Sequence, residues 1–90
     1  MSTLKRIVLD VLKPHHPNAL DFAGALADGT GGCCRVRVTV TEVDEKTEST
    51  VVAIEGDDIP YSDIVEVITQ LGASVHSIDE VEVSGAPAAD

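Results

Sequence analysis

The stretch CRVRVTVTEVDE, residues 34–45, has the most regular alternation in this 90-residue chain. Valine occupies every second position from 36 to 40, and arginine or threonine occupies the positions between. Such a period of two predicts a strand with one apolar face and one polar face. A polar turn at residues 44–47 and a second apolar run, TVVAIE at residues 50–55, follow directly. Together these segments predict a β-hairpin in the middle of the chain.

A helix is expected on each side of this hairpin. On the N-terminal side, apolar residues recur at helical spacing over residues 19–26, Asn18 can cap the helix, and a glycine-rich segment ends it. On the C-terminal side, Pro60 can occupy the first turn, an apolar stripe covers residues 61–71, and Gly72 ends the helix. Both predicted helices therefore have an apolar face that can pack against a sheet.

An outer strand is expected beyond each helix. The segment LKRIVLDVL at residues 4–12 has one fully apolar face, and residues 74–83 form the last strand. The element order is β-α-β-β-α-β, which predicts an α+β two-layer sandwich of ferredoxin-like architecture with an antiparallel sheet ordered 4-1-3-2. We expect one domain over residues 1–83 and a flexible C-terminal tail over residues 84–90.

The composition is strongly acidic. Sixteen Asp and Glu residues against six Lys and Arg residues give a formal net charge of −10. Nucleic-acid binding depends on neutralising phosphates, and docking on anionic membranes depends on basic segments, so neither partner is expected. A cationic partner, bound cations and adaptation to concentrated salt are all compatible with this charge.

The apolar stretches are short and interrupted by charges, so we expect no signal peptide, no membrane span and a cytoplasmic protein. Cys33 and Cys34 are adjacent, and adjacent cysteines rarely bridge each other. We therefore expect free thiols in a reducing compartment. Cys34 falls on the valine side of its strand, which predicts a small core residue at that position.

The expected topology collects several chemically active residues at the end of the sheet where the first strand stops. Asp10, Lys13 and His15 lie near that end, and His76 joins them because the last strand starts there. Asp10 and His76 are the predicted ligands of a divalent cation, whereas Lys13 and His15 would contact an anion or close the site. The alternative is that His15 is a solvated loop residue and His76 only fills a strand position.

One face of the predicted sheet has no covering layer. It carries Val8 and Leu12 among polar side chains, together with three of the six basic residues, Arg6, Arg35 and Arg37. An uncovered, half-apolar sheet face favours association with a partner. We therefore predict a homo-oligomer that packs sheet to sheet or edge to edge. The alternative is a monomer solvated by salt.

Four segments carry a family resemblance: RIVLDVLKPH (6–15), VTVTEVDEKTES (38–49), IEGDDI (54–59) and LGASVHSIDEV (71–81). With these segments the chain resembles an uncharacterised archaeal family, catalogued as domain of unknown function 211. The resemblance implies a ferredoxin-like fold, an archaeal source and an oligomer, and it implies no established activity. An archaeal source combined with this acidity indicates a haloarchaeon. The paired cysteines depart from the family pattern.

Three hypotheses about function follow. The first is a non-enzymatic oligomeric binding module for a divalent cation or small ligand, and the second is a structural or protein-interaction subunit without a ligand. The third is a small enzyme of unknown reaction. No catalytic residue is predicted, because no nucleophile lies beside an oriented base. His76 and Ser77 are strand neighbours and face opposite sides.

Overall fold

The predicted hairpin lies at one edge of a four-stranded antiparallel sheet. The computed structural model describes residues 2–85 and pairs β2 (Cys34–Val43) with β3 (Thr47–Gly56). β3 also pairs with β1 (Ser2–Pro14), and β4 (Ser74–Gly85) pairs with the other side of β1. The sheet order β2-β3-β1-β4 confirms the predicted order 4-1-3-2, read from the opposite edge.

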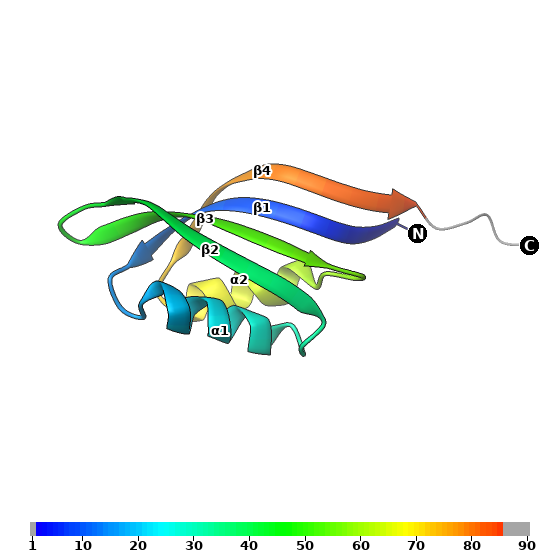
Figure 1. The fold of residues 1–90 in the computed structure, drawn as a ribbon, viewed down its shortest axis with the longest axis horizontal. Helices are drawn as coiled ribbons and strands as arrows, with labels where there is room; N and C mark the ends of the chain where they lie inside the picture. Colours follow the sequence, from blue (N-terminus) through cyan, green and yellow to red (C-terminus); the bar gives the residue numbers. More distant parts are fainter. Residues whose placement is uncertain (1, 86–90) are drawn as a thin grey trace, which may run out of the picture.

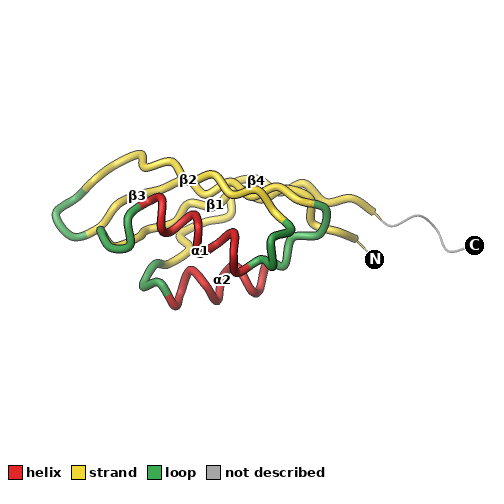
Figure 2. Tube along the Cα trace, turned by 60° about the horizontal axis from the view of Figure 1, so that its bottom comes forward, coloured by secondary structure: helices red, strands yellow, loops and turns green. Residues whose placement is uncertain are grey.

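Two helices cover one face of this sheet, so the molecule has two layers (Figure 1). α1 (Ala19–Gly29) begins after Asn18, whose side-chain oxygen accepts a 2.8 Å hydrogen bond from the Asp21 backbone N–H. α2 (Tyr61–Gln70) ends before Gly72, which has a φ of +81°. Figure 2 shows both helices on the same side of the sheet. Within residues 2–85, neither helix has the length and apolarity to span a membrane.

The hydrophobic core fills the space between the sheet and the helices. Strand alternation and helical spacing direct aliphatic side chains and the single phenylalanine into this space. The buried core residues are Ile7, Leu9, Val11, Phe22, Leu26, Val52, Ile54, Ile59, Ile64, Ile68 and Ala73. Val36 and Val38 of β2 pack at its margin. The predicted apolar faces of the strands and helices are therefore confirmed, and the fold is the α+β sandwich expected from the sequence.

The outer strands are longer than predicted. β1 continues past Leu12 to Pro14, and β4 continues to Gly85, two residues into the segment predicted as a tail. The two strands pair along their length, and Ser2 is the cross-strand partner of Gly85. Each of these strands therefore provides the backbone hydrogen-bond partners that allow the other strand to be longer. The remaining part of the predicted tail, residues 86–90, lies outside the described residues.

Candidate functional site

Lys13 and His15 meet at Glu48, at the end of the sheet where β1 stops. The Lys13 side chain is fully buried, and its Nζ donates hydrogen bonds of 2.8 Å to Glu48 Oε1 and to the carbonyl of Pro14. His15 Nδ1 lies 3.0 Å from Glu48 Oε2, and His15 Nε2 lies 2.9 Å from the carbonyl oxygen of Glu45. This Lys13–Glu48–His15 cluster ties the loop after β1 to the turn between β2 and β3.

The cluster shifts the pKa values of two of its members. The hydrogen bond to Glu48, followed by the contact with the Glu45 carbonyl, raises the pKa of His15 above its ordinary value. The hydrogen bonds from Lys13 and His15 lower the pKa of Glu48. Both ring nitrogens of His15 face oxygen acceptors, so both contacts are hydrogen bonds only when the imidazole carries two protons. The cluster therefore favours a charged His15 and an ionised Glu48.

The cluster is expected to make stability decline as the pH rises through the raised pKa of His15. Because the pKa of His15 is raised on folding, its contribution is fully present below about pH 6.5 and is lost as the pH rises through the raised pKa. The lowered pKa of Glu48 affects stability in acid. The contribution of Glu48 to stability is present above about pH 4.5 and is lost as the pH falls through the lowered pKa. The urea concentration at the midpoint of unfolding should therefore decrease as the pH rises from about 6 through the raised pKa of His15.

The variant His15→Gln should show a smaller fall in the urea midpoint over the same pH range. His16→Gln is the matched control, because His16 is exposed on the same loop. It should keep the full pH dependence of the native protein. Equal pH dependence in His15→Gln and in the native protein would contradict the role assigned to His15.

The four predicted ligand-binding residues are divided between two places. Lys13 and His15 belong to the cluster, where both are bonded to Glu48. Asp10 lies on the other face of β1, and its partner on β4 is Ser77, next to the exposed His76. Asp10 and His76 therefore lie on adjacent strands but are not register partners, because the pairing shifts between Asp10 and Val11, and neither belongs to the cluster. Among residues 2–85, no three His, Cys, Asp or Glu side chains are grouped so as to hold a metal ion. The cation site at Asp10 and His76 stays a prediction.

Cys33 and Cys34 form a disulfide, so the prediction of two free thiols is wrong. Cys33 lies before the first residue of β2 and follows Gly31 and Gly32, which both have positive φ. The alternation that would point adjacent strand residues to opposite faces therefore does not hold at this junction. Cys34 packs against the core as predicted, and Gly56 leaves the space for it. A Cβ at Gly56 would lie 2.7 Å from Cys34 Sγ.

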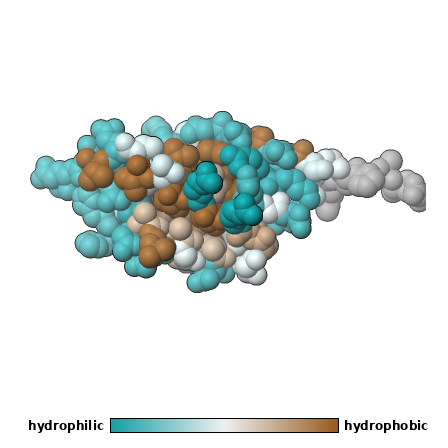
Figure 3. Space-filling view, viewed as in Figure 1, coloured by the Kyte–Doolittle hydropathy of each residue, from teal (hydrophilic) through white to brown (hydrophobic). Residues whose placement is uncertain are grey.

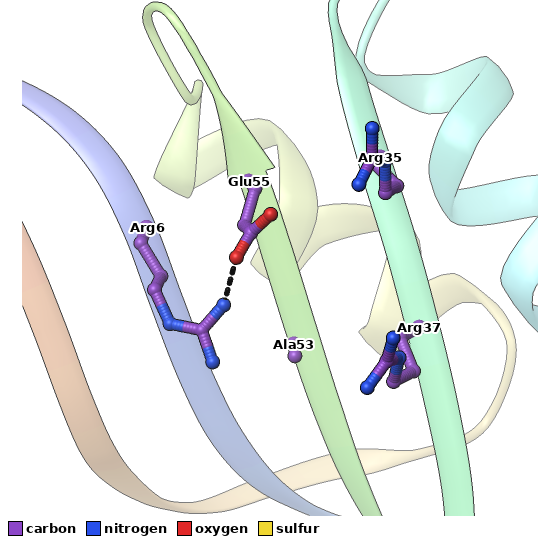
Figure 4. Close-up of a pocket in the computed structure, with 5 residues that line it drawn as sticks. All are labelled: Arg6, Arg35, Arg37, Ala53 and Glu55. Carbon is purple, nitrogen blue, oxygen red and sulfur yellow. Dashed lines mark hydrogen bonds and ion pairs between the residues drawn. The ribbon is translucent and has the colours of Figure 1, made fainter.

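The sheet face turned away from the helices, here called the open face, contains a small hollow (Figure 4). Five residues from three strands line it: Arg6, Arg35, Arg37, Ala53 and Glu55. Arg6 is ion-paired with Glu55 and with Glu80 of β4, and the hydrogen bond to Glu80 is the main cause of its raised pKa. Within the described part of the chain, Arg35 and Arg37 make no ion pair. Two arginines of an acidic protein thus face solvent without a carboxylate partner.

The size of the hollow limits what it can hold. Its volume is about 90 Å³, whereas sites for small molecules measure about 300–1,000 Å³. A wider recess of about 660 Å³ adjoins it near Cys33, but it is broadly open to solvent and has charges of both signs around it. Arginine binds carboxylates through a planar fork of donors. The small hollow lined by the arginines therefore fits a single carboxylate group better than a whole metabolite.

Aliphatic side chains are exposed on both edge strands. On β4, Ile78, Val81 and Val83 are each more than half exposed, and on β2 the exposed fraction of Val43 is 64%. Figure 3 shows hydrophobic patches among hydrophilic ones on the side of the molecule that presents β2 and α1. Neither edge of the sheet is paired with a further strand within residues 2–85. Among residues 2–85, the sheet therefore has an uncovered face and two unpaired edges.

The sequence located the open face but assigned no role to three acidic residues. Glu48 is the partner of Lys13, and Glu80 and Glu82 line the β4 side of the open face. Alternation along β4 could have placed Glu80 and Glu82 on one face. The pairing of Glu48 with Lys13 follows only from the register between β1 and β3.

Comparisons with known proteins agree with the resemblance stated from the sequence. The family model DUF211, described as "Uncharacterized ArCR", matches residues 5–87. The uncharacterised protein MJ0319 of Methanocaldococcus jannaschii is 44% identical over 81 residues, which cover 90% of this chain and 82% of that protein. The haloarchaeal source is not tested by these matches and stays a prediction. The chain therefore belongs to the DUF211 family of uncharacterised archaeal proteins.

Proposed function

We propose that the protein is a non-enzymatic module that assembles with copies of itself through its sheet. The observation that carries this proposal is the sheet itself. In the described part of the chain it has one face without a covering layer and two unpaired edges with exposed aliphatic side chains. Unpaired strand edges and apolar patches are typical sites of association between protein chains. An interaction subunit with a different protein partner would use the same surfaces and is the alternative outcome of the test below.

The physical terms for and against assembly can be separated. Val8, Val51 and Ala53 are only partly buried on the open face, and covering such side chains contributes about 25 cal/mol per Å² of apolar surface. The net charge of −10 opposes association, because like-charged molecules repel each other. Salt reduces the range of this repulsion to about 3 Å at 1 M. Assembly is therefore expected to strengthen as the salt concentration rises.

Sedimentation velocity and light scattering over a wide range of protein and salt concentrations test the proposal. We expect masses that are multiples of the 9.4 kDa chain, with a larger assembled fraction in concentrated salt. Leu20→Lys is the control, because Leu20 is exposed on α1, outside the sheet, and its replacement should leave the assembled mass unchanged. A 9.4 kDa species alone under every condition would overturn self-assembly and leave the interaction with a different partner.

Three finer proposals accompany this one. They are a divalent cation or small ligand held near Asp10 and His76, a cytoplasmic location, and a haloarchaeal source. The first rests on the residue types and their adjacent strands, and the second rests on apolar stretches that are short and interrupted by charges. The third rests on the acidic composition and the archaeal family.

A further inference from the structure

Two rows of side chains cross the open face from β2 to β4. The strand registers align them, because Arg6 is opposite Glu55 on one side and Glu82 on the other, and Glu55 is opposite Arg35. The first row, in sheet order, is Arg35, Glu55, Arg6 and Glu82, with alternating charges that begin positive. The second row is Arg37, Ala53, Val8 and Glu80, with a positive end, an apolar middle and a negative end.

Each row becomes its own electrostatic complement when its order is reversed. Reversing the first row places a residue of opposite charge at each of its four positions, and reversing the second exchanges its two charged ends. A two-fold axis that lies between two sheets and runs parallel to the strands performs this reversal, because it places β2 of one copy over β4 of the other. Contacts around such an axis occur twice, once in each direction.

We propose that two copies pack their open faces together around a two-fold axis parallel to the strands. Arg35 then faces the partner's Glu82, and Arg37 faces the partner's Glu80. Arg6 faces the partner's Glu55, while Val8 covers the partner's Ala53. This inference rests on the proposed self-assembly and adds the orientation of the two copies.

The unpaired arginines favour this arrangement over other ways of covering the face. Arg35 and Arg37 have no ion-pair partner among the described residues, and a charge that is buried without a partner is costly. The hollow beside them, with a volume of about 90 Å³, is about large enough for one carboxylate group. A covering layer must therefore bring carboxylates to β2. A second copy of this chain has them at the required spacing, on alternate residues of β4.

Electrostatics also select the direction of the axis. An axis perpendicular to the strands would place β2 over the partner's β2, so that the two pairs of arginines would face each other. Like charges brought together across an interface weaken binding strongly. The axis parallel to the strands brings opposite charges together in both rows. The charges thus fix the orientation, while the apolar centre of the second row is buried in either case.

The available area is sufficient for a specific contact. Four strands about 4.8 Å apart, each about ten residues long at about 3.3 Å per residue, present about 600 Å² per copy. Two such faces give about 1,200 Å², which is the lower limit of stable, specific protein interfaces at about 1,200–2,000 Å². A dimer with a measurable dissociation constant is therefore expected, and its affinity should respond to single charge reversals.

A charge-swap experiment tests the orientation. Arg35 and Glu82 are suitable because they lie on the two edge strands and neither has an ion pair within its own chain among the described residues. Arg35→Glu and Glu82→Arg should each raise the dissociation constant of the dimer about tenfold or more, measured by sedimentation at moderate salt. The double variant Arg35→Glu/Glu82→Arg should return it to within about threefold of the native value.

Several controls keep the outcomes distinct. Lys46→Glu makes the same charge change as Arg35→Glu in the turn between β2 and β3, outside the open face, and should leave the dissociation constant nearly unchanged. Far-UV circular dichroism confirms that each variant is folded, and Glu82→Gln provides a milder probe with a smaller loss of affinity.

Oligomers that form equally well in all charge variants would overturn this orientation and leave self-assembly intact. A double variant that fails to recover would also overturn it. A native protein that stays monomeric under every condition would overturn both self-assembly and this orientation.

Discussion

Replacing the buried Lys13 with alanine is expected to lower the free energy of unfolding by about 3–5 kcal/mol, which is the usual effect of removing one member of a buried ion pair. The Lys13 side chain is fully buried, and only 17% of the Glu48 side chain is exposed. Lys13→Ala removes the packed methylene stem and leaves the Glu48 carboxylate with His15 as its remaining cationic partner. Urea denaturation followed by circular dichroism, at one salt and protein concentration, measures the change.

A set of variants separates the packing of Lys13 from its charge. Lys13→Met keeps most of the apolar volume and should destabilise less than Lys13→Ala. Lys13→Met/Glu48→Leu should recover much of the loss, because an apolar pair of similar volume often replaces a buried ion pair at little cost. Lys46→Ala, in the exposed turn, should stay within about 0.5 kcal/mol of the native protein. Equal destabilisation by Lys13→Met and Lys13→Ala would contradict a contribution from the buried stem.

Phe22→Ala is expected to destabilise the fold by about 3–5 kcal/mol, because it leaves a cavity where the single phenylalanine of the chain lies between α1 and the sheet. The side chain is fully buried. Domains of this size have a total stability of about 5–15 kcal/mol, so the loss is a large fraction of the whole. A shift of about 4–8 °C in the melting temperature accompanies each kcal/mol in a small domain.

The same helix provides the control for this prediction. Leu20 is 80% exposed, so Leu20→Ala should change the melting temperature little. Both variants are compared at one protein concentration, because assembly would make the melting temperature depend on it. A small effect of Phe22→Ala, similar to that of Leu20→Ala, would contradict the position of Phe22 in the core.

The main elements of the fold follow from local patterns in the sequence. Valine at every second position of residues 36–40 predicts β2, and Asn18 followed by apolar residues at helical spacing predicts the start of α1; both are confirmed. The ends of the outer strands were less predictable, because β1 and β4 are extended by pairing with each other. A strand end that depends on its partner leaves no local mark in the sequence.

The chemistry of individual residues was harder to predict than the fold. Lys13 was expected to contact an anion, but alternation after Val11 places its side chain on the buried side, where Glu48 is its partner. Free thiols were expected because a bridge between adjacent cysteines strains the backbone. Cys33 instead precedes the strand, follows two glycines with positive φ, and is bonded to Cys34. Both outcomes depend on where a strand begins or ends, which is the least certain part of a pattern-based prediction.

The pairing of Ser2 with Gly85 makes the architecture circular in a topological sense. A connection between these two residues would turn β4 and β1 into a second hairpin beside the one formed by β2 and β3. The chain would then be a closed ring in which two hairpins alternate with two helices. The same sheet order is obtained wherever such a ring is opened in a loop. The sheet order therefore does not depend on which loop contains the ends of the chain.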